Sequence, residues 1–123
     1  MIIISYQSGQ PIYEQIVEQI KFHVMKEYLK PGDFIPSVRK MALEIGVTPN
    51  TVAKAYQELE RQGVIQTIPG KGTFIAEKIG SHMDKVQLEK IENTVRSQLV
   101  ELRLLGYSKE DTLKLVGRLY EGL

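Results

Sequence analysis

The sequence predicts an α+β fold that is mainly α-helical and has two parts. Between residues 10 and 63, apolar side chains recur every three or four positions in three segments, which is typical of amphipathic helices. Residues 64–77 instead alternate apolar and polar side chains in two short runs, as half-buried strands do. The helical spacing returns in residues 78–123. We therefore expect one mixed domain over 1–77 and a helical segment over 78–123.

The N-terminal residues predict an extended arm followed by a helix. Residues 1–10 begin with three β-branched isoleucines and end in Ser-Gly, which favours an extended chain. Gln10-Pro11 is expected to start the helix, since proline is well tolerated at the first helical position. Apolar residues keep helical spacing as far as Leu29, and residues 30–33 (Lys-Pro-Gly-Asp) then favour a turn. The helix is predicted to end near Leu29.

Two shorter helices follow, joined by a tight turn. Ser37 suits the N-cap of the first helix, and Gly46 suits the left-handed turn after its end. Thr48 is expected to cap the second helix, with Pro49 at its first position and Gly63 after its end. Two short helices joined by a turn that contains glycine form a helix-turn-helix.

The two runs after Gly63 are predicted to pair as a β-hairpin. They cover residues 64–68 and 73–77, and Pro-Gly-Lys-Gly at 69–72 forms the turn between them. A helix-turn-helix followed directly by a hairpin is a winged helix-turn-helix, in which the hairpin tip is the wing. Residues 1–77 are therefore predicted to form a winged helix-turn-helix domain.

Residues 78–123 are expected to form two further helices. We interpret Gly-Ser-His-Met at 80–83 as a linker and helix start. A continuous apolar stripe follows until Gly106-Tyr107 interrupts it. Ser108 is expected to start the last helix, because Asp111 three residues later resembles the second member of a capping box. The stripe of the first helix is Leu88, Ile91, Val95, Leu99, Leu102 and Leu105, and the second helix carries Leu113, Leu115, Val116, Leu119 and Tyr120.

Composition narrows the classes of function. Without cysteine the chain has no disulfide framework and no thiolate metal site, and its two histidines, His23 and His82, lie far apart in sequence. We expect no metal and no cofactor. No apolar run approaches the ~18 residues of a membrane helix, and the apolar start is too short for a signal peptide, so a cytoplasmic protein without a membrane partner is expected. The net charge is only +1, so a polyanionic partner must be argued from local charge.

Four short motifs stand in a fixed order between residues 35 and 77: Pro36-Ser37-Val38-Arg39, Gly46-Val47, Asn50-Thr51-Val52 and Gly70-Lys71-Gly72-Thr73-Phe74. Their order and spacing closely resemble the winged-helix DNA-binding domain of the GntR family of bacterial transcription regulators. Ile-Tyr-Glu-Gln-Ile at 12–16 is similar to the opening helix of that family. The short helical tail is similar to that of the YtrA subfamily, whose members lack large effector-binding domains.

The resemblance implies a DNA-binding surface, and the residue types suit it. The major groove of DNA admits one α-helix, whose N-terminal residues reach the base edges. A helix N-terminus also offers free N–H groups to a phosphate, and small or glycine residues at a wing let the backbone approach. The predicted DNA-binding residues are Ser37, Arg39, Thr48, Pro49, Asn50, Thr51, Lys54, Gly70, Lys71 and Gly72.

Individual roles within this set differ. Asn50 can pair with an adenine or bind a phosphate, and Lys54 can reach a guanine or the backbone. Arg39 lies in the helix that crosses the DNA backbone, where a guanidinium can clamp a phosphate or reach a base. Pro49 departs from the arginine that many family members have there and that contacts DNA in some branches. The Pro-Asn-Thr form is itself familiar from the YtrA branch.

Local charge supports this surface modestly. Over residues 36–54 there are three basic side chains and one acidic side chain, a net charge of +2. Electrostatic affinity is therefore expected to be moderate, and a dimer would double the phosphate contacts.

Simpler interpretations compete with DNA contact. Ser37 and Thr48 serve as helix caps whatever else they do, and Arg39 can pair with Glu44 instead. Asn50 and Lys54 can be merely exposed polar residues. We expect Tyr56 and Phe74 to lie in the core rather than to stack on bases, and Glu58, Glu60 and Arg61 to form a solvated helix end.

No catalytic motif is found, so we expect no enzyme. The glycine-rich Pro-Gly-Lys-Gly-Thr lacks the spacing of a phosphate-binding loop and precedes a strand rather than a helix.

The apolar stripe of the tail exceeds what a winged helix of ~70 residues needs to bury, and two helices alone make a poor core. The tail can pack back on the first domain or pair with a second chain. A twofold dimer matches a palindromic operator, so we expect dimerisation. An effector would have to bind at the dimer interface or between tail and head, because the tail is too short to enclose a pocket. The predicted dimerisation residues are Leu88, Ile91, Val95, Leu99, Leu102, Leu115 and Leu119.

The leading hypothesis is therefore a homodimeric, sequence-specific repressor that binds a palindromic operator in double-stranded DNA. The resemblance further implies control of a transporter operon. The alternative is a winged-helix adaptor that binds proteins and has no specific DNA site.

Overall fold

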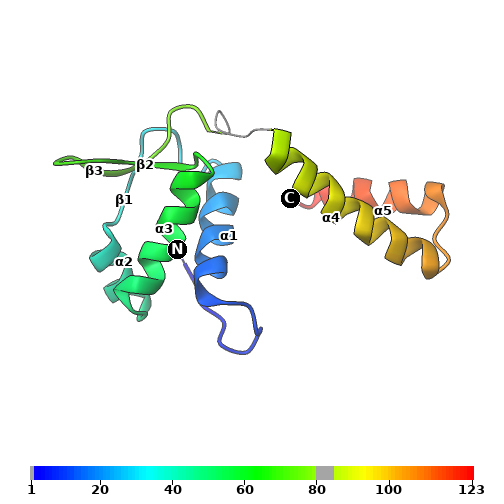
Figure 1. Ribbon diagram of the computed structural model, residues 1–123, viewed down its shortest axis with the longest axis horizontal. Coiled ribbons are helices and arrows are strands. Elements are labelled where there is room, and N and C mark those ends of the chain that lie inside the picture. The colour runs from blue at the N-terminus through cyan, green and yellow to red at the C-terminus, as the bar shows by residue number, and fades with distance from the viewer. Residues whose placement is uncertain (1, 80–84) are drawn as a thin grey trace. The chain divides into compact units, whose positions relative to one another are not determined.

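The computed structural model describes residues 2–79 and 85–123. They form two compact units, one within Met1–Met83 and one within Asp84–Leu123, and each is described by itself (Figure 1). The segment 80–83 that the sequence suggested as linker and helix start lies outside the described residues.

The first helix, α1, spans Ile12–Met25 and ends four residues before the predicted end at Leu29. It stops because Glu27 adopts a left-handed conformation with φ +62°. The N–H of Tyr28 donates to the carbonyl of His23 at 2.9 Å, and the N–H of Glu27 donates to that of Val24 at 3.1 Å, which is the Schellman arrangement. Leu29 still packs against the core. The predicted helix end was therefore wrong, since an apolar residue with helical spacing lies beyond the real end.

Replacing Glu27 with glycine is expected to raise the free energy of unfolding by about 0.5 kcal/mol, measured by urea denaturation. The left-handed conformation costs a non-glycine residue roughly 1–2 kcal/mol, which the substitution by glycine would recover. Glycine loses more entropy on folding, and this offsets part of the recovered stability. Glu18→Gly is the matched control, because Glu18 is exposed in the middle of the same helix and glycine there costs about 1 kcal/mol. Destabilisation by both variants would contradict the left-handed turn at Glu27.

The helix-turn-helix forms as the sequence predicts. α2 spans Val38–Ile45, and α3 spans Pro49–Arg61. The Ser37 hydroxyl accepts the N–H of Lys40 at 3.2 Å, and Gly46 closes α2 with φ +72°. Thr48 caps α3 and Pro49 occupies its first turn. Both predicted caps are therefore confirmed.

A small antiparallel sheet packs beside these helices. β1 (Phe34–Ile35), β2 (Ile65–Ile68) and β3 (Gly72–Ile75) lie in the order β1-β3-β2. The predicted hairpin is β2 and β3, with Ile65 opposite Ile75. β1 places Phe34 opposite Phe74 and was not predicted, since two residues are too few to show alternation. β1 leads directly into α2, so the sheet is coupled to the helix-turn-helix.

The core of the first unit lies where α1, α3 and the sheet meet, and α1 and α3 run side by side in Figure 1. Tyr56 is buried as predicted, and its hydroxyl donates to the carbonyl of Pro36 at 2.6 Å. Phe74 was also expected in the core but is only half-buried, with its ring centroid 4.3 Å from that of the exposed Phe34. The largest fully buried side chains are Ile16, Ile20, Val52, Leu59 and Ile75.

The N-terminal arm is held by two glutamines of α1 instead of by a neighbouring strand. The backbone N–H of Ile3 donates to the Gln19 side chain at 2.8 Å, and that side chain donates to the Ile3 carbonyl at 2.6 Å. Gln15, which is buried, makes the same pair of bonds with the backbone of Ser5, each at 2.8 Å. These amide groups satisfy backbone positions that a strand would otherwise pair.

The second unit contains α4 (Lys85–Leu104) and α5 (Lys109–Glu121). Gly106, with φ +95°, ends α4, and the predicted capping box between Ser108 and Asp111 begins α5. Neither helix contains a buried residue. Among the described residues, no helix of either unit is long and apolar enough to cross a membrane.

Candidate nucleic-acid interface

The N-terminus of α3 presents the first group of predicted DNA-binding residues. Thr48, Pro49 and Asn50 are exposed, and Thr51 is half-buried. The Thr48 hydroxyl accepts the N–H of Thr51 at 3.4 Å and lies 2.9 Å from the Thr51 hydroxyl. Within the described part of the chain, the Asn50 amide has no hydrogen-bond partner. Asn50 is therefore the side chain of this turn most open to an external partner.

The next predicted residues lie at the start of α2, which packs against α3. Arg39 is exposed, and over residues 2–79 and 85–123 it forms no hydrogen bond or ion pair. The alternative pairing of Arg39 with Glu44 is accordingly not found. Ser37 is exposed at the N-cap of α2, where its hydroxyl already accepts a backbone N–H.

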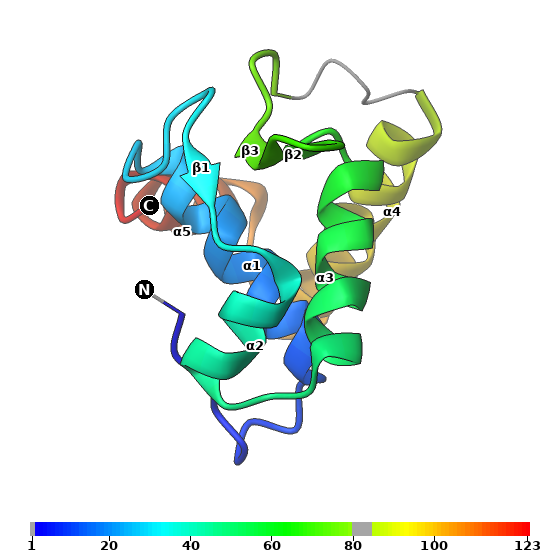
Figure 2. The ribbon, with the colours of Figure 1, turned by 90° about the vertical axis from the view of Figure 1, so that its left-hand side faces the viewer.

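The turn between β2 and β3 forms the predicted wing. Gly70 and Gly72 have φ +79° and +118°, conformations that other residues rarely adopt. Lys71 is exposed at the tip, and its N–H donates to the carbonyl of Ile68 at 2.9 Å. In Figure 1, α2, the first turn of α3 and the tip of the hairpin all lie to the left of α1, and Figure 2 shows the molecule from that side. Within this unit, the three segments that carry the predicted residues thus lie on one side of α1 in that view.

Lys54 lies on α3 one helical turn after Asn50, and its side chain contacts α1. Its Nζ atom is 4.0 Å from the ring centroid of Tyr13, within the range of a cation–π contact. The Tyr13 hydroxyl donates to Oε1 of Glu14 at 3.3 Å, and burial, followed by the charge of Glu14, raises the pKa of Tyr13. The contact of Tyr13 with Lys54 was not predicted, because it exists only once α1 packs on α3.

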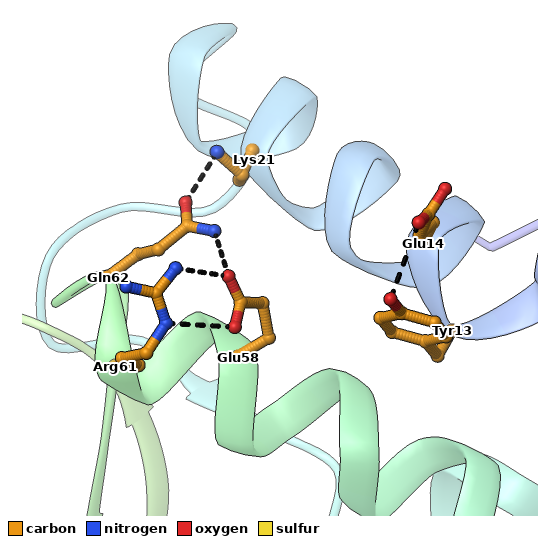
Figure 3. Close-up of polar contacts among 6 residues, drawn as sticks. All are labelled: Tyr13, Glu14, Lys21, Glu58, Arg61 and Gln62. Atoms are coloured by element: carbon orange, nitrogen blue, oxygen red, sulfur yellow. Dashed lines mark hydrogen bonds and ion pairs between the residues drawn. The ribbon is translucent and has the colours of Figure 1, made fainter. Parts of the chain in front are cut away.

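The C-terminal end of α3 is held against α1 by a polar cluster of four residues, the Glu58 cluster (Figure 3). Glu58 accepts hydrogen bonds from Arg61 at 2.5 and 3.0 Å and from Gln62 at 2.8 Å. The Gln62 side chain in turn accepts from Nζ of Lys21, on α1, at 2.5 Å. The expectation of a simply solvated helix end was wrong for Glu58, which is half-buried. This cluster fixes α3, and hence its N-terminal turn, relative to α1.

Acid is expected to remove the stability that Glu58 contributes. The hydrogen bonds from Arg61 and then from Gln62 lower the pKa of Glu58 to about 2 from an ordinary value of 4.5. Because the folded-state pKa is the lower one, the contribution is fully present above pH ~4.5 and disappears as the pH falls towards about 2. After allowance for solvent screening of a partly exposed pair, Glu58→Gln should lower the free energy of unfolding by about 1 kcal/mol at pH 7.

The measurement is urea denaturation of both proteins between pH 7 and pH 2. The difference between them should shrink towards zero across the acid range. Glu89→Gln, at an exposed position of α4, is the control and should match wild type throughout. A difference between wild type and Glu58→Gln that stayed constant with pH would contradict the assigned protonation.

The predicted dimerisation residues lie on α4 and α5, and most of them are exposed. Leu88, Ile91, Val95 and Leu99 retain 42–52% of their accessible surface, and Leu119 retains 61%. Leu102 and Leu115 are half-buried. Among residues 85–123, the apolar stripe of α4 therefore stays largely exposed.

Chemically, the described residues of the first unit offer exposed hydrogen-bonding and cationic groups. In residues 2–79 and 85–123, no three His, Cys, Asp or Glu side chains lie close enough to hold a metal ion. The exposed amide, guanidinium and ammonium groups suit a ligand that carries phosphates and hydrogen-bonding edges.

Comparison with known proteins adds evidence of a different kind. A family model described as "Bacterial regulatory proteins, gntR family" matches residues 12–75. The chain is 41% identical over 110 residues to the HTH-type transcriptional repressor YtrA of Bacillus subtilis (strain 168), an alignment that covers 89% of this chain and 85% of that protein.

Two solved structures are also similar. The transcriptional antiterminator from Listeria monocytogenes EGD-e has a TM-score of 0.88 and 44% identity, covering 98% of this chain and 90% of that one. AraR(DBD) in complex with operator ORX1 has a TM-score of 0.55 and 26% identity, covering 62% of this chain and 95% of that one.

Proposed function

Because the chain belongs to the GntR family of bacterial transcription regulators, we propose that it is a sequence-specific repressor that binds a palindromic operator as a homodimer in the bacterial cytoplasm. Its relatives are transcription regulators, and the chain is not an enzyme. The observation that carries the proposal is the exposed N-terminal turn of α3, where the amide of Asn50 has no partner in the described part of the chain. The guanidinium of Arg39, on α2, likewise has no partner among the described residues.

Names of similar proteins support the two parts of this proposal. YtrA of Bacillus subtilis is named a transcriptional repressor, and the AraR domain is solved with an operator. By analogy, α3 is the recognition helix, which enters the major groove with its first turn. Arg39, Ser37 and the wing then contact the flanking backbone.

Residue roles within the interface follow from which groups are already engaged. The hydroxyls of Thr48 and Thr51 share one hydrogen bond, and that of Thr48 also accepts the N–H of Thr51, so Thr48 keeps one site for DNA and Thr51 keeps two. Asn50 has its whole amide available and is the best candidate for a base contact, such as a bidentate pair with adenine. Lys71 at the wing supplies charge for a phosphate.

A gel-shift experiment tests this function directly. DNA from the promoter of the protein's own gene should be bound in preference to random DNA at physiological salt, and Asn50→Ala should reduce the preference. Equal affinity for both DNAs would refute a sequence-specific regulator and favour the adaptor alternative. The proposed target is a transporter operon, and adjacent transporter genes in the genome would identify it.

Dimerisation is proposed to occur through the apolar stripe of α4 and α5. Sedimentation equilibrium at micromolar concentration should give twice the 14.0 kDa mass of one chain. Val95→Glu should weaken the dimer at least about tenfold, because it places an unpaired charge in an apolar interface. A wild-type chain that stays monomeric would contradict this proposal.

Asn93→Glu is the matched control for Val95→Glu. It introduces the same charge, but two helical residues correspond to about 200°, so it lies on the other face of α4. It should leave the dimer intact. Loss of the dimer in both variants would show that the stripe is not the interface.

A further inference from the structure

Tyr13 and Lys54 form a contact across the boundary between α1 and α3. Tyr13 is half-buried in the first turn of α1, and Lys54 is exposed one helical turn after Asn50. The 4.0 Å separation of the ammonium from the ring centroid is well inside the ~6 Å limit for cation–π attraction. Figure 3 shows the Tyr13 ring in the space between the two helices.

The two carboxylates whose charges act on Tyr13, Glu58 and Glu14, form hydrogen bonds with residues other than Lys54. Glu58 is four residues further along α3, the spacing at which a lysine and a glutamate usually pair. Its oxygens instead accept hydrogen bonds from Arg61 and Gln62. Glu14 accepts a hydrogen bond from the Tyr13 hydroxyl. The described residues give Lys54 no hydrogen bond or ion pair, so the ring is its partner.

An aromatic ring restrains an ammonium without cancelling its charge. A free lysine side chain has up to ~2 kcal/mol of rotamer entropy to lose when it binds a phosphate. A ring that already holds the Nζ atom reduces that loss, while leaving the positive charge able to attract an anion. The position also matters, since Lys54 is held towards α1 and away from the exposed first turn of α3.

We propose that Tyr13 is a positioning residue for DNA binding: its ring holds the Lys54 ammonium at the α1 edge of the recognition helix, where Lys54 binds a DNA phosphate and not a base. This inference rests on the proposed function. Glu58 takes part indirectly, because its bonds to Arg61 and Gln62 leave the lysine free of a salt bridge.

The first experiment needs no DNA. A lysine above an aromatic ring has its side-chain methylene protons shifted upfield by the ring current. In proton NMR spectra of the full chain, the Lys54 signals should be shifted in wild type and in Tyr13→Phe, which keeps the ring. They should return to ordinary values in Tyr13→Leu. Unchanged Lys54 shifts in Tyr13→Leu would overturn the contact itself.

The second experiment measures DNA affinity by fluorescence anisotropy. Tyr13→Leu should weaken binding about threefold, equally for promoter and random DNA, whereas Tyr13→Phe should retain wild-type affinity. Lys54→Ala should weaken binding and lower the slope of log affinity against log salt by about one. Combined with Tyr13→Leu, Lys54→Ala should cost less than it does alone.

Three results of the second experiment would overturn the positioning role. The first is a loss of affinity in Tyr13→Leu that depends on the base at one position of the DNA. The second is a loss of affinity in Tyr13→Phe equal to that in Tyr13→Leu. The third is fully additive effects of Tyr13→Leu and Lys54→Ala on affinity. Failure of wild type to prefer promoter DNA would refute the proposed function instead. In that case the NMR result would still report on the ring contact.

Discussion

Replacing Arg39 with alanine is expected to weaken operator binding by about 10- to 100-fold, the range that the loss of a bidentate guanidinium contact produces. Arg39 is exposed on α2, which packs against α3, and no other described residue engages its guanidinium. Arg39→Ala should therefore lower the affinity for DNA and leave the free energy of unfolding almost unchanged. Fluorescence anisotropy with promoter DNA measures the loss, and urea denaturation checks that stability is unchanged.

The matched control for Arg39→Ala is Arg118→Ala. Arg118 is exposed near the end of α5. Its replacement removes the same charge, but from a part of the chain that is not proposed to touch DNA. Its effect on operator affinity should stay within about twofold, as expected for a solvent-exposed charge that makes no DNA contact and is screened by salt. If both variants lost affinity equally, overall charge and not a specific Arg39 contact would explain the binding.

The largest expected effect on stability comes from Leu59→Ala, which should lower the free energy of unfolding by about 2–5 kcal/mol. Leu59 lies on α3 with 0% of its surface accessible, so its truncation removes apolar contacts and leaves a cavity. A small domain has only about 5–15 kcal/mol of total stability, so much of it would be lost. Urea denaturation measures the change.

Leu43→Ala is the matched control for Leu59→Ala. Leu43 lies on α2 with 85% of its surface accessible, and the same substitution there should change stability by no more than about 0.5 kcal/mol. A loss below 1 kcal/mol for Leu59→Ala, or equal losses at both sites, would show that α3 does not pack on the described core.

Three helix ends explain why some boundaries were predictable and one was not. α1, α3 and α4 all end in the same Schellman arrangement, in which a left-handed residue follows the helix. That residue is Gly63 after α3 and Gly106 after α4, and the sequence located both ends. After α1 the left-handed residue is Glu27, and glutamate does not mark a helix end in the sequence. The end of α1 was therefore predicted too late, at the turn that follows Leu29.

The residues of the candidate interface likewise include some that the sequence predicted and some that it did not. Ser37 and Thr48 are local capping signals, so the sequence located the first turns of α2 and α3 and hence the group around Asn50. The contacts of Tyr13 with Lys54 and of Lys21 with Gln62 each join residues 41 positions apart. Such pairs depend on how α1 packs on α3, which helical periodicity does not specify.

The most direct test of the central claim is selection of bound sequences from a random double-stranded DNA library by the full chain at physiological salt. A homodimeric winged helix-turn-helix should enrich a twofold-symmetric sequence whose half-sites lie about one helical turn, ~10 base pairs, apart or a multiple of it. Recovery of no common sequence, or of a single half-site without symmetry, would contradict the account.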